Sequence, residues 1–85
     1  MKVLDFYADW CGPCQMLIPI MEELEKEHED VEFVRINIDE QREMAEKYEI
    51  MSIPTLIFLD DNDNIVETLI GLHSKKDIEK ILQAV

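Results

Sequence analysis

The sequence predicts an α/β domain whose strands and helices follow the order β-α-β-α-β-β-α. Strand-like and helix-like patterns alternate twice in the first half of the chain, and two β-prone segments joined by turn formers precede a last helical pattern. The 85 residues are 47% hydrophobic and 33% charged, which is the size and composition of one globular domain. We therefore expect a single domain over residues 1–85.

The first half of the chain predicts a β-α-β unit. Residues 2–8 form an apolar-rich run typical of a buried strand, although Asp5 lies in its middle. Apolar residues recur every three or four positions over residues 13–27, which predicts a helix. Residues 31–38 alternate between two faces and predict a second strand. Because a helix separates the two strands, we expect them to be parallel, with a right-handed crossover.

The middle of the chain predicts a short helix and a β-hairpin. Asp39 is expected to cap the helix, which ends at about Tyr48. Thr55–Leu59 and Ile65–Ile70 are both apolar and β-prone, and residues 60–64 between them are turn formers. Adjacent strands joined by such a turn are expected to pair in antiparallel fashion.

A last helix is expected to begin after Ser74, which precedes a capping-box-like Lys75-Lys76-Asp77. Its apolar residues fall at positions i, i+3, i+4 and i+7, namely Ile78, Ile81, Leu82 and Val85. This helix would therefore present one apolar face to the sheet.

The charge of the chain excludes several classes of function. Asp and Glu number 20 against 8 Lys and Arg, so the net charge is −12. Such a charge repels phosphate backbones and anionic bilayers, so we expect no nucleic-acid or membrane partner. No apolar run approaches the roughly 20 residues that span a bilayer, and the first residues place an acid where a signal peptide needs apolar side chains. We expect a cytoplasmic monomer.

The only two cysteines, Cys11 and Cys14, flank Gly12 and Pro13 where the first strand ends and the first helix begins. A helix N-terminus carries roughly half a positive charge, which favours the thiolate of Cys11 at the exposed helix start. Residues three apart in a helical turn bring their Cβ atoms within about 5–6 Å, so Cys14 can close a disulfide onto Cys11. We interpret Cys11 as the nucleophile and Cys14 as the resolving thiol.

Two other interpretations of the cysteine pair are weaker. A disulfide that closes so short a loop would stabilise the fold by only about 2 kcal/mol in the chain-entropy model. A zinc site needs four ligands, and beyond the cysteines the only histidines are His28 and His73, both distant in sequence. Redox chemistry is therefore favoured, with the Cys11–Cys14 disulfide as the redox group and with neither a metal nor another cofactor.

These motifs resemble those of the thioredoxin family over nearly the whole chain. The thioredoxin active-site segment is similar to DFYADWCGPC at residues 5–14, and the next strand end is similar to residues 36–39. Ile53-Pro54-Thr55 resembles the cis-proline loop, and Gly71 matches the glycine of the substrate-docking loop. The chain resembles a short thioredoxin of glutaredoxin length, without the strand and helix that usually come first.

The resemblance implies a thioredoxin-like fold with a four-stranded mixed sheet in the order 2-1-3-4 and helices on both faces. It implies a protein-disulfide reductase that acts on disulfide-containing proteins and is recharged by a thioredoxin-reductase-type electron donor. Asp5, buried behind the cysteines, would accept the proton of Cys14, and Arg35 stands where thioredoxins usually have Lys. Six residues would bind the substrate: Trp10, Gly12, Pro13, Ile53, Pro54 and Gly71.

Two alternative functions stay open from the sequence. A glutaredoxin-like enzyme dependent on a small thiol is suggested by the chain length, but Gly71-Leu72-His73-Ser74 lacks the second glycine and the acid of the glutaredoxin thiol-binding turn. A module that binds a partner regardless of its redox state is the other alternative. A variant with both cysteines replaced by serine that kept its function would favour the second alternative.

Overall fold

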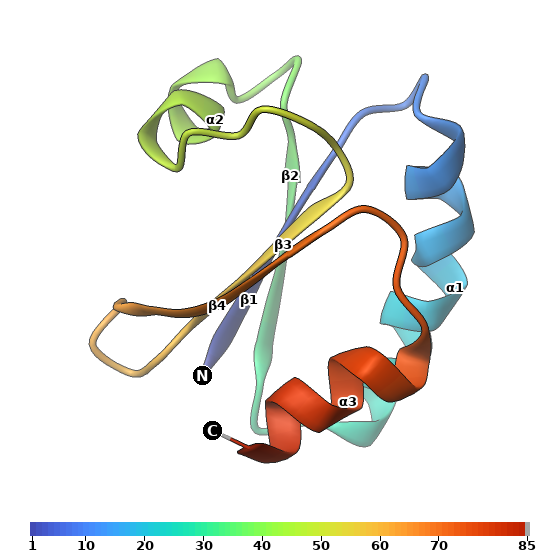
Figure 1. The fold of residues 1–85 in the computed structure, drawn as a ribbon, viewed down its shortest axis with the longest axis vertical. Helices are drawn as coiled ribbons and strands as arrows, with labels where there is room; N and C mark the ends of the chain where they lie inside the picture. The colour runs from blue at the N-terminus through green and yellow to red at the C-terminus, as the bar shows by residue number, and fades with distance from the viewer. Residues whose placement is uncertain (85) are drawn as a thin grey trace.

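The structure, a computed structural model, describes residues 1–84 as one mixed β-sheet flanked by helices (Figure 1). The element order β-α-β-α-β-β-α is the one that the sequence predicted. In chain order the elements are β1 (Lys2–Tyr7), α1 (Gly12–Glu27), β2 (Glu32–Asn37), α2 (Arg42–Lys47), β3 (Thr55–Leu59), β4 (Ile65–Ile70) and α3 (Lys75–Ala84).

The four strands lie in the order β2-β1-β3-β4, which confirms the expected 2-1-3-4 topology. β1 is parallel to β2, as a β-α-β crossover requires, and β3 is antiparallel to both β1 and β4. β1 is therefore an inner strand with a partner on each side. Asp5 at its centre lies opposite Arg35 on β2 and Leu56 on β3.

Helices cover both faces of the sheet, as expected. α1 and α3 lie against one face and α2 lies on the other (Figure 1). The core beneath α1 and α3 is the larger of the two, and its buried members are Val3, Leu17, Met21, Leu24, Leu56, Phe58, Ile78 and Leu82. On the opposite face the buried residues are Leu4, Phe6, Ile36, Ile57 and Leu59. Alternation along β1 and β3 sends successive side chains to opposite cores, so these strands are buried on both faces.

The predicted cap of α2 is wrong, because the helix begins at Arg42 and its N-cap residue is Gln41. Asn37 closes a turn before the helix: its carbonyl oxygen accepts the backbone N–H groups of Glu40 and Gln41. The Asn37 side chain also accepts the backbone N–H of Asp39 at 2.9 Å. Asp39 thus lies in the turn, where its carboxylate is free to bond elsewhere.

The predicted start of α3 is confirmed, because the hydroxyl of Ser74 accepts the backbone N–H of Asp77 at 3.2 Å. Ile78 and Leu82 on this helix are buried, and Ile81 packs against the same core. Val85, which the sequence placed on the same apolar face, lies outside the described residues. Within residues 1–84, no helix combines the length and the hydrophobicity needed to cross a membrane.

Candidate active site

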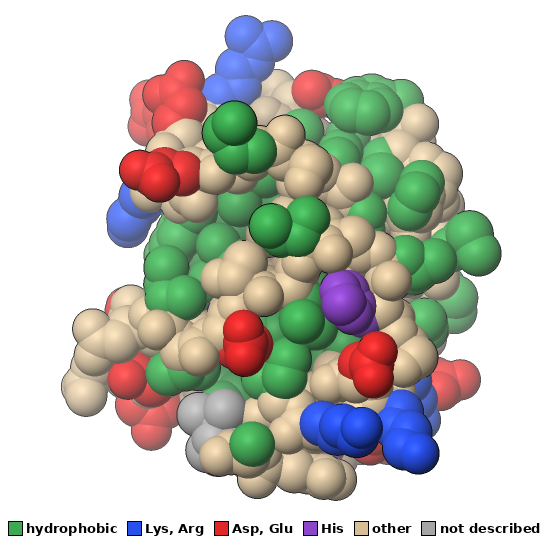
Figure 2. Space-filling model, in the orientation of Figure 1, with side chains coloured by type: hydrophobic (Ala, Val, Ile, Leu, Met, Phe, Trp, Pro, Cys, Tyr) green, Lys and Arg blue, Asp and Glu red, His purple; other side chains and the backbone are tan. Residues whose placement is uncertain are grey.

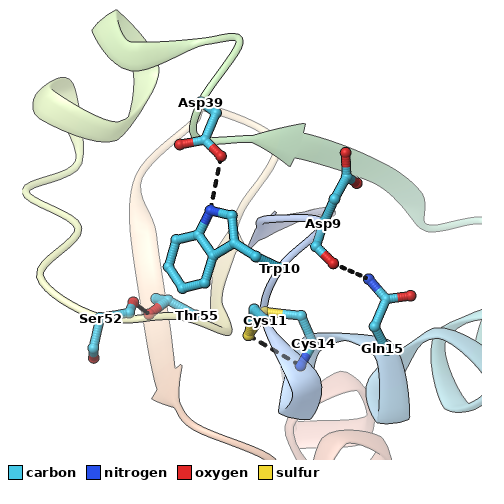
Figure 3. Close-up of a disulfide and its surroundings, with 8 residues drawn as sticks. All are labelled: Asp9, Trp10, Cys11, Cys14, Gln15, Asp39, Ser52 and Thr55. Carbon is cyan, nitrogen blue, oxygen red and sulfur yellow. Dashed lines mark hydrogen bonds between the residues drawn. A yellow bond between two sulfur atoms is a disulfide. The ribbon is translucent and has the colours of Figure 1, made fainter.

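The two cysteines form a disulfide at the start of α1, as predicted (Figure 3). Cys11 is the N-cap residue, with an extended backbone, and Pro13 lies in the first turn, where its missing N–H removes no helical hydrogen bond. The Cα atoms of Cys11 and Cys14 are 5.2 Å apart. The Cys11 sulfur also accepts the backbone N–H of Cys14 at 3.2 Å. This hydrogen bond and the helix dipole therefore both favour negative charge on the Cys11 sulfur.

Both cysteines are buried in this oxidised form, with exposed fractions of 5% for Cys11 and 3% for Cys14. The expectation that Cys11 lies at an exposed helix start is therefore wrong for the disulfide state. Ile38, in the loop after β2, and Ile53, in the loop before β3, pack against the cluster that the cysteines form with Ala8. The two cysteines are thus almost equally buried, and they differ in hydrogen bonding, because the Cys11 sulfur accepts a backbone N–H.

The loop before β3 contains a cis peptide bond between Ile53 and Pro54, as the resemblance implied. The carbonyl oxygen of Pro54 accepts the backbone N–H of Gly71 at 2.8 Å, so the loop after β4 is fastened to the cis-proline loop. Gly71 has a φ of 92°, which side chains rarely tolerate. The hydroxyl of Thr55 donates to the Ser52 carbonyl at 2.7 Å and closes the same loop (Figure 3).

Trp10 precedes the disulfide and is 70% exposed. Its indole N–H donates to a carboxylate oxygen of Asp39 at 2.9 Å (Figure 3), so the indole is held while most of its surface stays open. Asp39 is a site residue that the sequence did not single out for this role, although its position at the strand end beside Ile38 could have suggested it. Beside Trp10 lies an open cleft of about 320 Å³ whose other lining residues are Ile38, Ile50, Met51, Ser52 and Ile53.

Asp5 is only 6% exposed, and its buried oxygen Oδ1 has no hydrogen-bond partner among residues 1–84. Desolvation raises the pKa of Asp5 to about 6, although the positive charge of Arg35 partly opposes this shift. A cavity of about 210 Å³ connects Asp5 to Cys14 and Arg35, and its other lining residues are Tyr7, Asp9, Gln15 and Ile18. The structure therefore brings a carboxylate of raised basicity to the same cavity as the second cysteine.

A separate cluster lies at the end of α1, where Glu27, His28 and Glu79 each place one potential ligand atom within 4.8 Å of the others. The ammonium group of Lys75 lies 2.6 Å from the Glu27 carboxylate and already supplies a positive charge there. None of these residues lines the cavity of Asp5 or the cleft beside Trp10.

A cysteine pair that closes one helical turn contributes little to stability, yet this pair lies between a polarising helix start and a buried carboxylate. The fold and the site together define the class of thiol-disulfide oxidoreductases. Comparison with known proteins narrows this class, because the thioredoxin family model matches residues 1–84. The chain belongs to the thioredoxin family.

Individual relatives agree with this assignment. The chain is 46% identical over 79 residues to a thioredoxin of Bacillus subtilis, with coverage of 92% of this chain and 75% of the relative. It is 46% identical over 80 residues to a thioredoxin of Chlamydia pneumoniae, with coverage of 94% and 78%. Oxidised mitochondrial thioredoxin 3 of Saccharomyces cerevisiae superposes with a TM-score of 0.90 at 33% identity, covering 99% of this chain and 77% of that one. The relatives support thioredoxin-type disulfide oxidoreductase activity, as the resemblance implied.

Proposed function

We propose that the protein reduces disulfide bonds in other proteins, with Cys11 as the attacking thiolate and Cys14 as the resolving thiol. The observation that carries this assignment is the N-cap position of Cys11, whose sulfur accepts the backbone N–H of Cys14. The same hydrogen bond would stabilise a Cys11 thiolate in the reduced protein, since it donates to negative charge. Cys14 lies inside the helix and receives no such bond through its sulfur in residues 1–84.

The reaction takes place in two exchanges. The Cys11 thiolate attacks one sulfur of the substrate disulfide, so a bond forms between Cys11 and the substrate while the substrate disulfide breaks. The released substrate thiolate takes a proton from solvent. Cys14 then loses its proton and attacks the Cys11 sulfur, which releases the second substrate thiolate and forms the Cys11–Cys14 disulfide. Two electrons pass from the dithiol to the substrate.

Asp5 is the proposed proton acceptor for Cys14 in the second exchange. The two residues line one cavity, and the raised pKa of Asp5, about 6, makes its carboxylate a stronger base than an exposed one. At neutral pH this carboxylate is still mostly ionised and can accept a proton. Because its oxygen Oδ1 has no hydrogen-bond partner in the described part of the chain, no bond has to break before this oxygen accepts the proton.

The substrate is proposed to lie over Trp10, Gly12 and Pro13 on one side of the disulfide and over Ile53, Pro54 and Gly71 on the other. A Cβ placed at Gly12 would meet no atom within 4 Å, so this position opens to solvent. Figure 2 shows hydrophobic side chains at the surface among charged ones, and Met51 beside the cleft is 94% exposed. An extended peptide with apolar side chains would bury this surface and could bond to the backbone of the cis-proline loop.

A thioredoxin-reductase-type donor is the proposed source of electrons, and the Cys11–Cys14 disulfide is the only redox group that the reaction needs. One similar chain, with a TM-score of 0.90 and 31% identity, comes from a structure titled for thiol resolution in a yeast mitochondrial 1-Cys peroxiredoxin through glutathione and thioredoxin systems. A peroxiredoxin is thus one substrate class to test. We place the protein in the cytoplasm as a monomer formed by a single domain.

A panel of reductants tests this function. The oxidised protein is incubated with insulin and either a flavin-dependent thioredoxin reductase with NADPH, a ferredoxin-dependent one, or glutathione. Multiple turnovers with a reductase support the proposal, and turnovers with glutathione alone would support the glutaredoxin-like alternative. The control is a Cys11→Ser, Cys14→Ser double variant, which should reduce no insulin with any donor.

A further inference from the structure

Arg35 is a neighbour of Asp5, but the Arg35 side chain forms its ion pair with another residue. The two residues are partners in the register of β1 and β2, and they line the same cavity as Cys14. The guanidinium Nη2 of Arg35 nevertheless donates to the Glu25 carboxylate on α1 at 3.2 Å. Within residues 1–84, no ion pair of 4.0 Å or less joins Arg35 to Asp5, and Asp5 Oδ1 has no hydrogen-bond partner.

We propose that Glu25 is a positioning residue for the oxidoreductase reaction: it holds the Arg35 guanidinium outward and so keeps the Asp5 carboxylate unpaired and able to accept a proton from Cys14. The inference rests on the proposed function, in which Asp5 is that acceptor. Glu25 itself does not line the cavity that Asp5 shares with Cys14.

The ion pair with Glu25 matters because Arg35 could otherwise turn toward Asp5 and pair with its carboxylate. A guanidinium is charged at every physiological pH and forms strong two-point bonds to carboxylates. If Arg35 turned toward Asp5 it would stabilise the ionised carboxylate and make it a weaker base. Because Arg35 cannot give up its proton, it also could not relay one between Cys14 and solvent.

Two charged side chains near Asp5 change the pKa of its carboxyl group in opposite directions. Arg35 on β2 lowers the pKa of Asp5, whereas Glu25 on α1 raises it, and both effects are smaller than that of burial. Leu56, the β3 partner of Asp5, carries no charge. Asp9 and Tyr7 are the other titratable side chains at the cavity in this oxidised form, in which Cys14 is held in the disulfide. Glu25 thus favours the protonated form of Asp5 both through its own charge and through the bond that holds Arg35.

Carboxyl-carbon NMR titration of Asp5 in the oxidised protein tests the positioning directly. Glu25→Gln should lower the pKa of Asp5 by roughly half a unit to one unit, because it frees Arg35 and removes a negative charge. Glu22→Gln removes the same charge from an exposed position on the same helix and should leave the pKa of Asp5 nearly unchanged. Glu25→Asp keeps a carboxylate, so it should lower the pKa of Asp5 by less than Glu25→Gln does.

A second variant separates the position of Arg35 from the direct charge of Glu25. Arg35→Gln should raise the pKa of Asp5, and in that background Glu25→Gln should shift it by less than half as much as in the wild type. Equal shifts in the two backgrounds would mean that Glu25 acts through its charge alone, and would overturn the proposal. An unchanged pKa of Asp5 in Glu25→Gln would overturn it as well.

The reaction provides the second measurement. Substrate release from the mixed disulfide is followed by rapid quench between pH 5 and pH 9, and its acidic limb should move to lower pH in Glu25→Gln by the same amount as the pKa of Asp5. A shifted pKa without a shifted limb would overturn the role of Glu25 in the reaction. The Asp5→Asn variant distinguishes a failure of the Glu25 proposal from a failure of the proposed function. Normal substrate release in this variant would show that Asp5 is not the proton acceptor. Slow release would support Asp5 as the acceptor, so that a negative result with Glu25→Gln would overturn only the role of Glu25.

Discussion

The backbone N–H of Cys14 donates a hydrogen bond to the sulfur of Cys11 at 3.2 Å, although the two side chains are almost equally buried. The bond exists because Cys11 is the N-cap residue of α1, where the first helical N–H groups have no carbonyl partner. It makes the two cysteines chemically different without making one more accessible. This asymmetry is the basis of the first prediction.

Replacing Cys11 or Cys14 by serine should block the reaction at two different steps. Cys11→Ser should abolish reduction of insulin disulfides, because the N-cap sulfur that would hold the thiolate is lost. Cys14→Ser should still attack once and then accumulate a mixed disulfide between Cys11 and the substrate. Mass spectrometry of the trapped adduct is the measurement. An adduct on Cys14 in the Cys11→Ser variant would reverse the two roles.

Asp5→Asn should raise the stability of the protein while slowing its reaction. Burial raises the pKa of Asp5 from its ordinary value of 3.8 to about 6, so the native state binds this proton more tightly than the unfolded chain does. The charged carboxylate therefore costs stability progressively as the pH rises from about 4 to above 6, and the total is on the order of 3 kcal/mol. Urea unfolding of the oxidised variant should show this gain at pH 8 and almost none at pH 3.

The same variant should release substrate from the mixed disulfide more slowly at pH 7, because an amide cannot accept the proton of Cys14. The first attack by Cys11 should proceed at the wild-type rate. Asp9→Asn is the matched control, since Asp9 lines the same cavity but is exposed. A variant that is less stable than wild type and releases substrate normally would make Asp5 a purely structural residue.

Gly71→Ala should destabilise the protein by about 1 kcal/mol through backbone strain alone. Gly71 has a φ of 92°, yet an added Cβ would meet no atom within 4 Å, so no steric clash contributes. Gly12→Ala is the control, because that Cβ also meets nothing and no left-handed backbone is required there. Urea unfolding should separate the two variants, and equal losses would show that the φ of Gly71 is not the cause.

Ser74→Ala should lower the free energy of unfolding by about 1 kcal/mol, because the Asp77 N–H at the start of α3 loses its acceptor. Ser74→Asp should retain the stability of the wild type, since a carboxylate can accept the same bond. Thermal or urea unfolding measures both variants. Equal losses in the two variants would indicate that the hydroxyl stabilises α3 by another route.

The element order was predictable because each segment carries its own periodicity, and Ser74 was predictable as a cap because its bond to Asp77 spans three residues. The same reasoning failed for Asp39, since its role depends on competitors outside the local pattern. Asn37 takes over the turn before α2, and Trp10, 29 positions away in the sequence, donates to the Asp39 carboxylate. A capping preference alone does not reveal either contact.

The redox chemistry could be predicted from the sequence alone, because a pair of cysteines three apart at a strand-to-helix junction depends only on local geometry and on the helix dipole. The sequence also marked Asp5 as unusual, since a carboxylate in the middle of an apolar strand must be buried or functional. The surroundings of these groups became visible only in the folded protein, where Ile53 packs against the disulfide and Arg35 is paired with Glu25, not with Asp5. Such contacts join separate elements, so the packing of α1 on the sheet fixes them, and no local pattern encodes that packing.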